Sequence, residues 1–90
     1  MSEVKRIIKS LKNDNEYHMY EDRIEVRSRS RTVMLPLPED RDRYMNYICF
    51  TDIFYMGDEL CVIVATRDNY DLRFPVDEDV IELRTPTPYY

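Results

Sequence analysis

ICFTDIFYMGDELCVIVATRDNYDLRF, residues 48–74, carries the strongest structural signal in this chain. Its side chains first alternate between two faces, which is the period-two pattern of a β-strand. Gly57-Asp58 follows, and a glycine in the first central position suits a two-residue hairpin loop. A loop of that length pairs Tyr55 with Leu60. The run therefore predicts a β-hairpin.

The second half of the hairpin is the best candidate for a core strand. Residues 60–65, LCVIVA, are apolar on both faces, which is typical of a strand in the middle of a sheet with cover above and below. Asp68-Asn69 suits another tight turn, and residues 70–74 alternate again. The sequence thus predicts a three-stranded antiparallel meander over 48–74.

The N-terminal residues show a different period. Val4, Ile7, Ile8 and Leu11 are spaced i, i+3, i+4 and i+7, so they share one face of a helix. An amphipathic helix over 3–12 is therefore expected to pack its apolar face on the sheet.

The predicted fold class is α+β, with a small antiparallel sheet of about five strands packed against the N-terminal helix. Ninety residues suffice for one domain, assigned to 1–84, and the Pro- and Tyr-rich residues 85–90 are expected to form an extended tail. The other expected elements are strands at 16–20, 23–35 and 80–84, a reversal at Glu21-Asp22, and a short helix near 39–47.

Charge is unevenly distributed along the chain. Residues 1–45 hold ten Lys and Arg against nine Asp and Glu, whereas residues 46–90 hold three Arg against nine carboxylates. The net charge of −5 therefore comes entirely from the second half, because the first half is close to neutral. An acidic surface repels nucleic acid backbones and membrane headgroups and attracts basic partners.

These features predict a non-catalytic protein-binding domain that engages a basic, nucleic-acid-binding surface of a partner by imitating phosphate charge. A phage- or virus-encoded inhibitor of host defence is one example of such an acidic inhibitor or regulator. Tyrosines are also enriched where proteins bind one another. The predicted partner-binding residues are Asp58, Glu59, Asp77, Glu78, Asp79, Glu82, Tyr89 and Tyr90. A solvated acidic turn and a frayed C-terminus are the alternatives for these residues.

Nucleic-acid binding is the alternative function. Arg27, Arg29 and Arg31 alternate with small polar residues, so on a straight strand they project from one face at intervals of roughly 6.5–7 Å. Such an Arg stripe could contact a phosphate backbone, or it could be an ordinary solvated face. The acidic net charge opposes nucleic-acid binding.

No catalytic set is visible in the sequence. His18 is the only histidine, and Cys49 and Cys61 lie in apolar, strand-like surroundings that favour small core residues over activated thiolates. The acidic run 77–79 lacks the glycine and the following glutamate of a calcium loop. We therefore expect neither an enzyme nor a cofactor.

The cellular setting and the assembly state follow from similar arguments. Two cysteines are too few for a disulfide framework, which favours a reducing cytoplasm, and no apolar run approaches the length of a membrane span. A monomer is expected, or a homodimer that pairs edge strands at 16–20 or 80–84.

Overall fold

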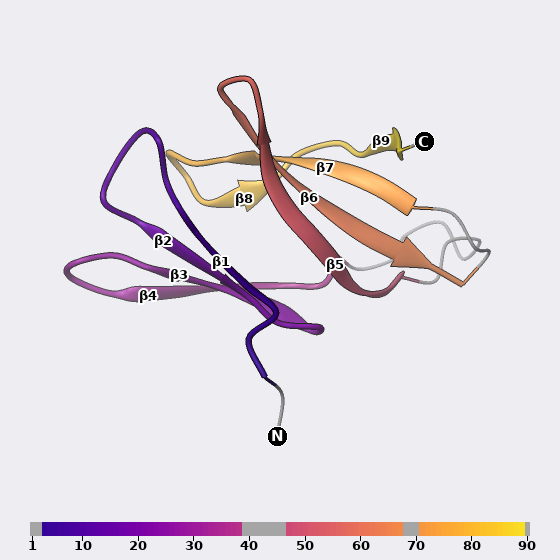
Figure 1. Cartoon of the computed structure of the whole chain (residues 1–90), viewed down its shortest axis with the longest axis horizontal. Helices are drawn as coiled ribbons and strands as arrows, with labels where there is room; N and C mark the ends of the chain where they lie inside the picture. The colour runs from indigo at the N-terminus through magenta and orange to yellow at the C-terminus, as the bar shows by residue number, and fades with distance from the viewer. Residues whose placement is uncertain (1–2, 39–46, 68–70, 90) are drawn as a thin grey trace.

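The computed structural model describes residues 3–38, 47–67 and 71–89, and in these residues the chain is all-β (Figure 1). The predicted α+β class is therefore wrong. The first sheet has the order β1-β2-β3-β4 and the second β5-β6-β7-β8, with β9 also paired to β7. The strands are β1 Arg6–Lys9, β2 Glu16–Met19, β3 Arg23–Arg27, β4 Thr32–Pro36, β5 Tyr47–Met56, β6 Glu59–Thr66, β7 Asp71–Asp77, β8 Glu82–Leu83 and β9 Thr87–Tyr89.

The predicted meander is confirmed as β5, β6 and β7, which pair antiparallel in sequence order. Tyr55 lies opposite Leu60, as the two-residue loop requires. Gly57 has a φ of 65°, and a positive φ at the first central position is the conformation of a type II′ turn. β6 lies between its two neighbours, and its residues 60–64 are buried on both faces, also as predicted.

The predicted helix over 3–12 is wrong, because Arg6–Lys9 forms β1 and pairs with β2. A ten-residue helix is marginal in water, and its apolar residues here are mostly β-branched, which favours extended backbone. In β1, Ile8 packs against the core, whereas Ile7 points to the other face and is 53% exposed. A short apolar run fits both periods, and pairing with β2 selects the strand.

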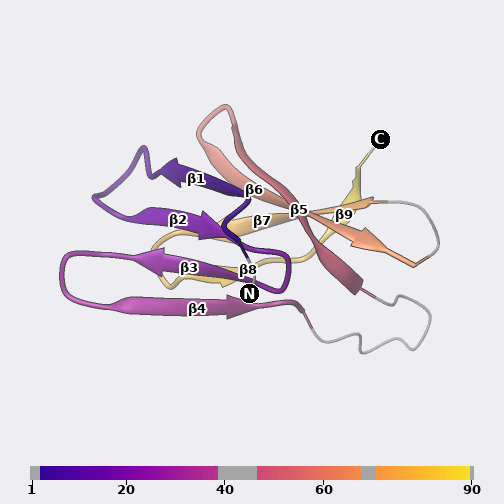
Figure 2. The same cartoon turned by 60° about the horizontal axis from the view of Figure 1, so that its bottom comes forward.

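The predicted strand over 23–35 is in fact a hairpin. Ser28 N–H donates to the carbonyl of Arg31 at 2.9 Å, and the Ser28 hydroxyl donates to the same carbonyl at 3.0 Å. The turn separates β3 from β4, which lie side by side in Figure 2. The expected reversal at Glu21-Asp22 is confirmed between β2 and β3. The expected helix near 39–47 falls mainly outside the described residues, and Tyr47 begins β5.

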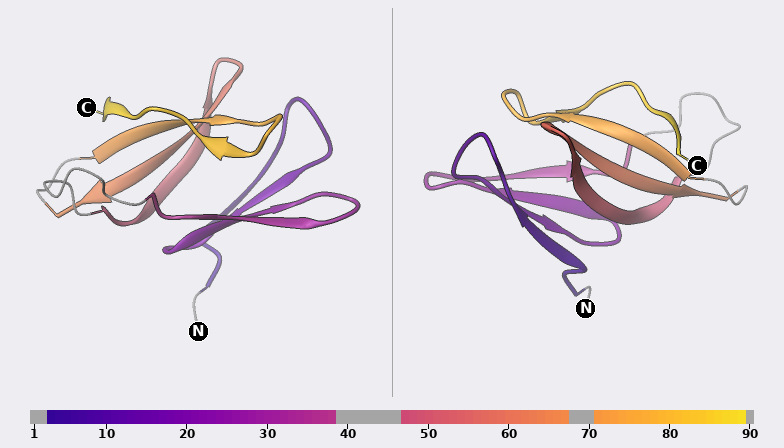
Figure 3. Two further views of the ribbon diagram at one scale, coloured as in Figure 1. Left: turned by 180° about the vertical axis from the view of Figure 1, so that it is seen from behind. Right: turned by 45° about the horizontal axis from the view of Figure 1, so that its top comes forward.

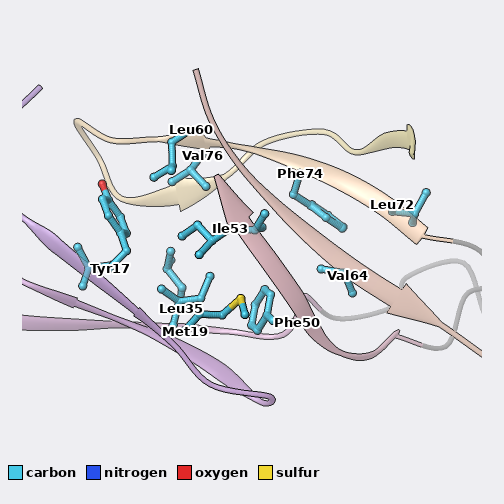
Figure 4. Close-up of a cluster of buried hydrophobic side chains, with 13 residues drawn as sticks. Tyr17, Met19, Leu35, Phe50, Ile53, Leu60, Val64, Leu72, Phe74 and Val76 are labelled. Atoms are coloured by element: carbon cyan, nitrogen blue, oxygen red, sulfur yellow. The ribbon is translucent and has the colours of Figure 1, made fainter. Parts of the chain in front are cut away.

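The two sheets form separate layers whose inner faces share one core (Figures 3 and 4). Backbone and side chains also join the layers at their margin. Phe50 N–H donates to the carbonyl of Glu21 at 2.8 Å, and Arg6 lies 3.3 Å from the carboxylate of Asp52. The core side chains labelled in Figure 4 are Tyr17, Met19 and Leu35 from the first sheet and Phe50, Ile53, Leu60, Val64, Leu72, Phe74 and Val76 from the second.

Candidate functional site

A hollow of about 390 Å³ lies where the β5–β6 hairpin, the turn after β7 and the β1–β2 loop meet. These three segments are at the same end of the molecule (Figure 1). We refer to it as the acidic hollow. Its carboxylates are Asp58, Glu59, Asp77, Glu78 and Asp79. Five of the eight predicted partner-binding residues are therefore brought together in one place, although about twenty residues separate the two acidic segments.

The acidic hollow has a charged rim. Five carboxylates face two cations, Lys12 and Arg84, which leaves an excess of three negative charges. Leu60, Pro75 and Val76 also border this space, but Leu60 and Val76 are buried in the core, so the accessible lining is mainly polar. A ligand that complements this lining is cationic.

Asp77 shapes the turn beside the hollow. Its Oδ1 accepts hydrogen bonds from the backbone N–H groups of Asp79 at 3.0 Å and Val80 at 3.3 Å, and its Oδ2 pairs with Arg84. The hydrogen bond from Val80, followed by that from Arg84, holds the pKa of Asp77 below its ordinary value. Asp77 is therefore a structural carboxylate of the turn.

Ile81 completes this turn in a strained conformation. Its φ is 56°, which is unusual for a β-branched residue. The side chain is half-buried and packs against the core, and this packing holds the backbone in place. Glu78 therefore lies in a turn that is held by Asp77 on its N-terminal side and by Ile81 on its C-terminal side.

Glu78 is a buried carboxylate that connects the two sheets. The residue is 5% exposed, and its Oε1 accepts hydrogen bonds from Ser10 Oγ at 2.7 Å, Tyr17 OH at 3.0 Å and Tyr55 OH at 2.9 Å. Its Oε2 is also buried but has no hydrogen-bond partner in the described part of the chain. We refer to these four residues as the hydroxyl cluster.

Sequence reasoning missed Ser10, Tyr17 and Tyr55. A buried tyrosine hydroxyl usually has a hydrogen-bond partner, so a tyrosine in an apolar strand signals that a partner exists. It does not signal which one, because Glu78 lies 61 residues from Tyr17 in the chain.

The other three carboxylates of the hollow differ from Asp77 and Glu78 in their exposure. Asp58, Glu59 and Asp79 are exposed, and none of them forms an ion pair with another described residue. Removing their charges therefore leaves the hydroxyl cluster and the Asp77 turn intact.

Two other predicted partner-binding residues lie outside the hollow lining. Glu82 is exposed in β8, opposite Asp77. Tyr89 belongs to β9, which pairs with β7, and its ring centroid is 6.0 Å from that of Phe54. The C-terminal segment thus adds a strand to the protein's own sheet. Tyr90 lies outside the described residues.

The Arg stripe is not presented by one straight strand. Arg27 ends β3 and pairs with Glu25 at 2.9 Å, whereas Arg29 lies in the following turn and pairs with Asp14 at 3.3 Å. Arg31 is exposed in the same turn. The hydrogen bond from Arg27 is the main cause of the lowered pKa of Glu25. Two of the three cations are therefore paired with carboxylates, one in β3 and one in the β1–β2 loop.

The histidine and the cysteines lie within strands β2, β5 and β6. His18 is 8% exposed in β2, with Nε2 3.2 Å from Glu16 Oε1. Cys61 is buried as predicted, and burial raises the pKa of its thiol, whereas Cys49 is only half-buried. Both thiols are free.

Tyr17 provides a test of the hydroxyl cluster. Burial, together with the charge of Glu78, raises the pKa of Tyr17 well above its ordinary value of 10.0. Above about pH 10 the unfolded chain loses this proton while the folded protein keeps it, so stability falls as the pH rises. Urea unfolding between about pH 9 and pH 11 should show this loss, up to about 1.4 kcal/mol per pH unit from this group.

Tyr17→Phe should reduce that slope, because phenylalanine does not ionise. Tyr89→Phe is the matched control, since Tyr89 is 40% exposed and distant from the cluster in the fold. If stability fell equally steeply with pH in wild type and Tyr17→Phe, the raised pKa of Tyr17 in the hydroxyl cluster would be contradicted.

Among the described residues, no group of three or more His, Cys, Asp or Glu side chains is arranged to hold a metal ion. The same part of the chain contains no helix long and apolar enough to cross a membrane.

Comparison with known proteins found no family model that matches this chain, and no significantly similar curated protein or solved structure.

Proposed function

We propose that this protein is a non-catalytic binding domain whose acidic hollow engages a basic surface of a partner protein. The observation that carries the proposal is the convergence of residues 58–59 and 77–79 on one hollow. Two turns that are separate in the sequence thereby bring the exposed carboxylates of Asp58, Glu59 and Asp79 to one space.

The electrostatics support this proposal. The hollow has three negative charges in excess, and Asp58, Glu59 and Asp79 are exposed on its rim. Clustered charge of one sign steers an oppositely charged partner and raises the association rate more than it raises affinity. A basic surface of the kind that binds nucleic acid is the complementary partner, so binding here would exclude nucleic acid from it.

A charge-neutral variant of the rim tests the proposal. Asp58→Asn, Glu59→Gln and Asp79→Asn together remove three charges without touching Asp77 or Glu78. We expect association with a fluorescein-labelled (Arg-Gly)₆ peptide at low salt to slow about tenfold, because steering is lost. Stopped-flow fluorescence measures this rate, and the effect should shrink as salt is raised.

The matched control removes the same number of charges elsewhere, by Glu3→Gln, Glu21→Gln and Asp22→Asn. These residues are exposed and lie outside the hollow lining. The control should associate within about twofold of wild type, since the local field at the hollow is unchanged. If both triple variants slow association equally, net charge alone acts and the hollow is not the binding site.

A further inference from the structure

We infer that the acidic hollow receives a single arginine side chain of the partner, with its guanidinium bound to Oε2 of Glu78. This inference rests on the proposed function and specifies which chemical group the partner inserts. It follows from the buried Glu78, whereas the proposed function follows from the exposed carboxylates at the rim.

Glu78 is the first observation. A carboxylate can accept hydrogen bonds at both oxygens, but Oε1 takes all three hydroxyl donors of the cluster, from Ser10, Tyr17 and Tyr55. Oε2 is buried and has no donor among the described residues, which is unusual for a charged group. Glu78 is among the residues that line the hollow, but Oε2 itself is covered, so a donor in the hollow can reach this oxygen only after neighbouring side chains move.

The lining of the hollow indicates which donor fits. It is mainly polar and carries an excess of negative charge, with a small apolar area at Pro75, so it suits a cationic head on a short hydrocarbon stem. Guanidinium is weakly hydrated and presents several donors in one plane, so it suits a partly buried carboxylate better than a compact ammonium does. The volume of about 390 Å³ accommodates one such side chain with room to spare.

The chain already contains one pairing of this kind in the same hollow. Arg84 reaches the hollow from beyond β8 and pairs with Asp77. Guanidinium binding to a carboxylate is therefore compatible with the local geometry. Because Oε2 of Glu78 is covered in the free protein, an entering guanidinium must displace side chains at the rim, where Lys12 is exposed.

Lys12 gives the inference an independent consequence. Its positive charge lines the hollow and opposes the entry of a second cation. Lys12→Ala should therefore strengthen binding of an arginine peptide about threefold to tenfold, as removal of a like charge predicts. This variant touches no core residue, so it tests the site even if substitution of Glu78 perturbs folding.

The experiment compares two peptides, acetyl-Gly-Ser-Arg-Ser-Gly-amide and the same peptide with citrulline in place of arginine. Citrulline keeps the shape and removes the charge. NMR titration of the full chain should show about tenfold tighter binding of the arginine peptide, as expected for a charge-assisted hydrogen bond. In Glu78→Gln this preference should fall to about twofold or less.

A second readout separates direct binding at Glu78 from general attraction. The ring signals of Tyr17 and Tyr55 should shift with the arginine peptide, because both hydroxyls share the carboxylate that the guanidinium binds. They should not shift with the citrulline peptide. Equal binding of the two peptides, or unchanged tyrosine signals on arginine binding, would overturn the inference.

The two proposals can fail separately. If the rim triple variant slows association but wild type does not distinguish arginine from citrulline, the basic-surface function stands and the arginine site is wrong. If the arginine preference and its loss in Glu78→Gln are observed while the rim variant has no effect, the site holds one side chain without a wider basic interface.

Discussion

Phe50→Ala is expected to lower the free energy of unfolding by about 3–5 kcal/mol, the range for a buried phenylalanine. Phe50 has no exposed surface and lies beside Met19 of the other sheet (Figure 4). Its N–H also joins the sheets through Glu21. Truncation leaves a cavity between the sheets. The expected decrease in the free energy of unfolding is a large fraction of the total stability of a small domain. Urea denaturation monitored by circular dichroism measures it.

Phe54→Ala is the matched control, because it removes the same side chain from the same strand. Phe54 is half-buried and faces Tyr89 of β9 instead of the shared core. We expect Phe54→Ala to lower the free energy of unfolding by about half as much as Phe50→Ala or less. The reason is that the half-buried Phe54 side chain buries less apolar area on folding than Phe50 does. Equal costs for the two substitutions would show that the core is not centred between the sheets.

Glu78→Ala is expected to destabilise the fold by about 2–3 kcal/mol, as loss of hydrogen bonds to a buried charged acceptor does. Tyr17 has no exposed surface, so its hydroxyl would be left without an acceptor in a buried position. Ser10 and Tyr55 lose the same acceptor. Denaturant midpoints at neutral pH measure this change.

Two substitutions control for Glu78→Ala. Asp79→Ala removes a carboxylate from the next residue, which is exposed, and should change stability by no more than about 0.5 kcal/mol. Glu78→Gln keeps an acceptor oxygen for the hydroxyls and should cost less than Glu78→Ala. If Glu78→Ala is as stable as Asp79→Ala, the hydroxyl cluster does not hold the sheets together.

The candidate site was only partly predictable. The carboxylates at 58–59 and 77–79 stand out in the sequence because acidic residues cluster at expected turns. Their different roles do not stand out, since Asp77 caps a turn, Glu78 is buried, and only Asp58, Glu59 and Asp79 are exposed. Burial depends on which segments cover a residue. Glu78 is covered in part by Ser10 and Tyr17, which belong to the other sheet and its β1–β2 loop.

The Arg stripe shows the same limit. Alternation of Arg with Ser and Thr fits a straight strand, but Ser28 closes a turn with Arg31 and moves Arg29 off the strand. Serine favours turns as well as exposed strand faces. The alternation alone could not distinguish these two outcomes.

Local signals were sufficient for the meander β5–β7. Its alternation, its doubly apolar central strand and the glycine at 57 act over a few residues, so they specify pairing and register without the rest of the chain. The uneven distribution of charge is likewise a property of the sequence alone. Other features depend on the tertiary structure. Residues 6–9 form β1 because β2 is available to pair with them. Glu78 accepts hydrogen bonds from Ser10 and Tyr17, which are 68 and 61 residues away in the chain. Contacts over such separations depend on how distant segments share one core, which no local pattern encodes.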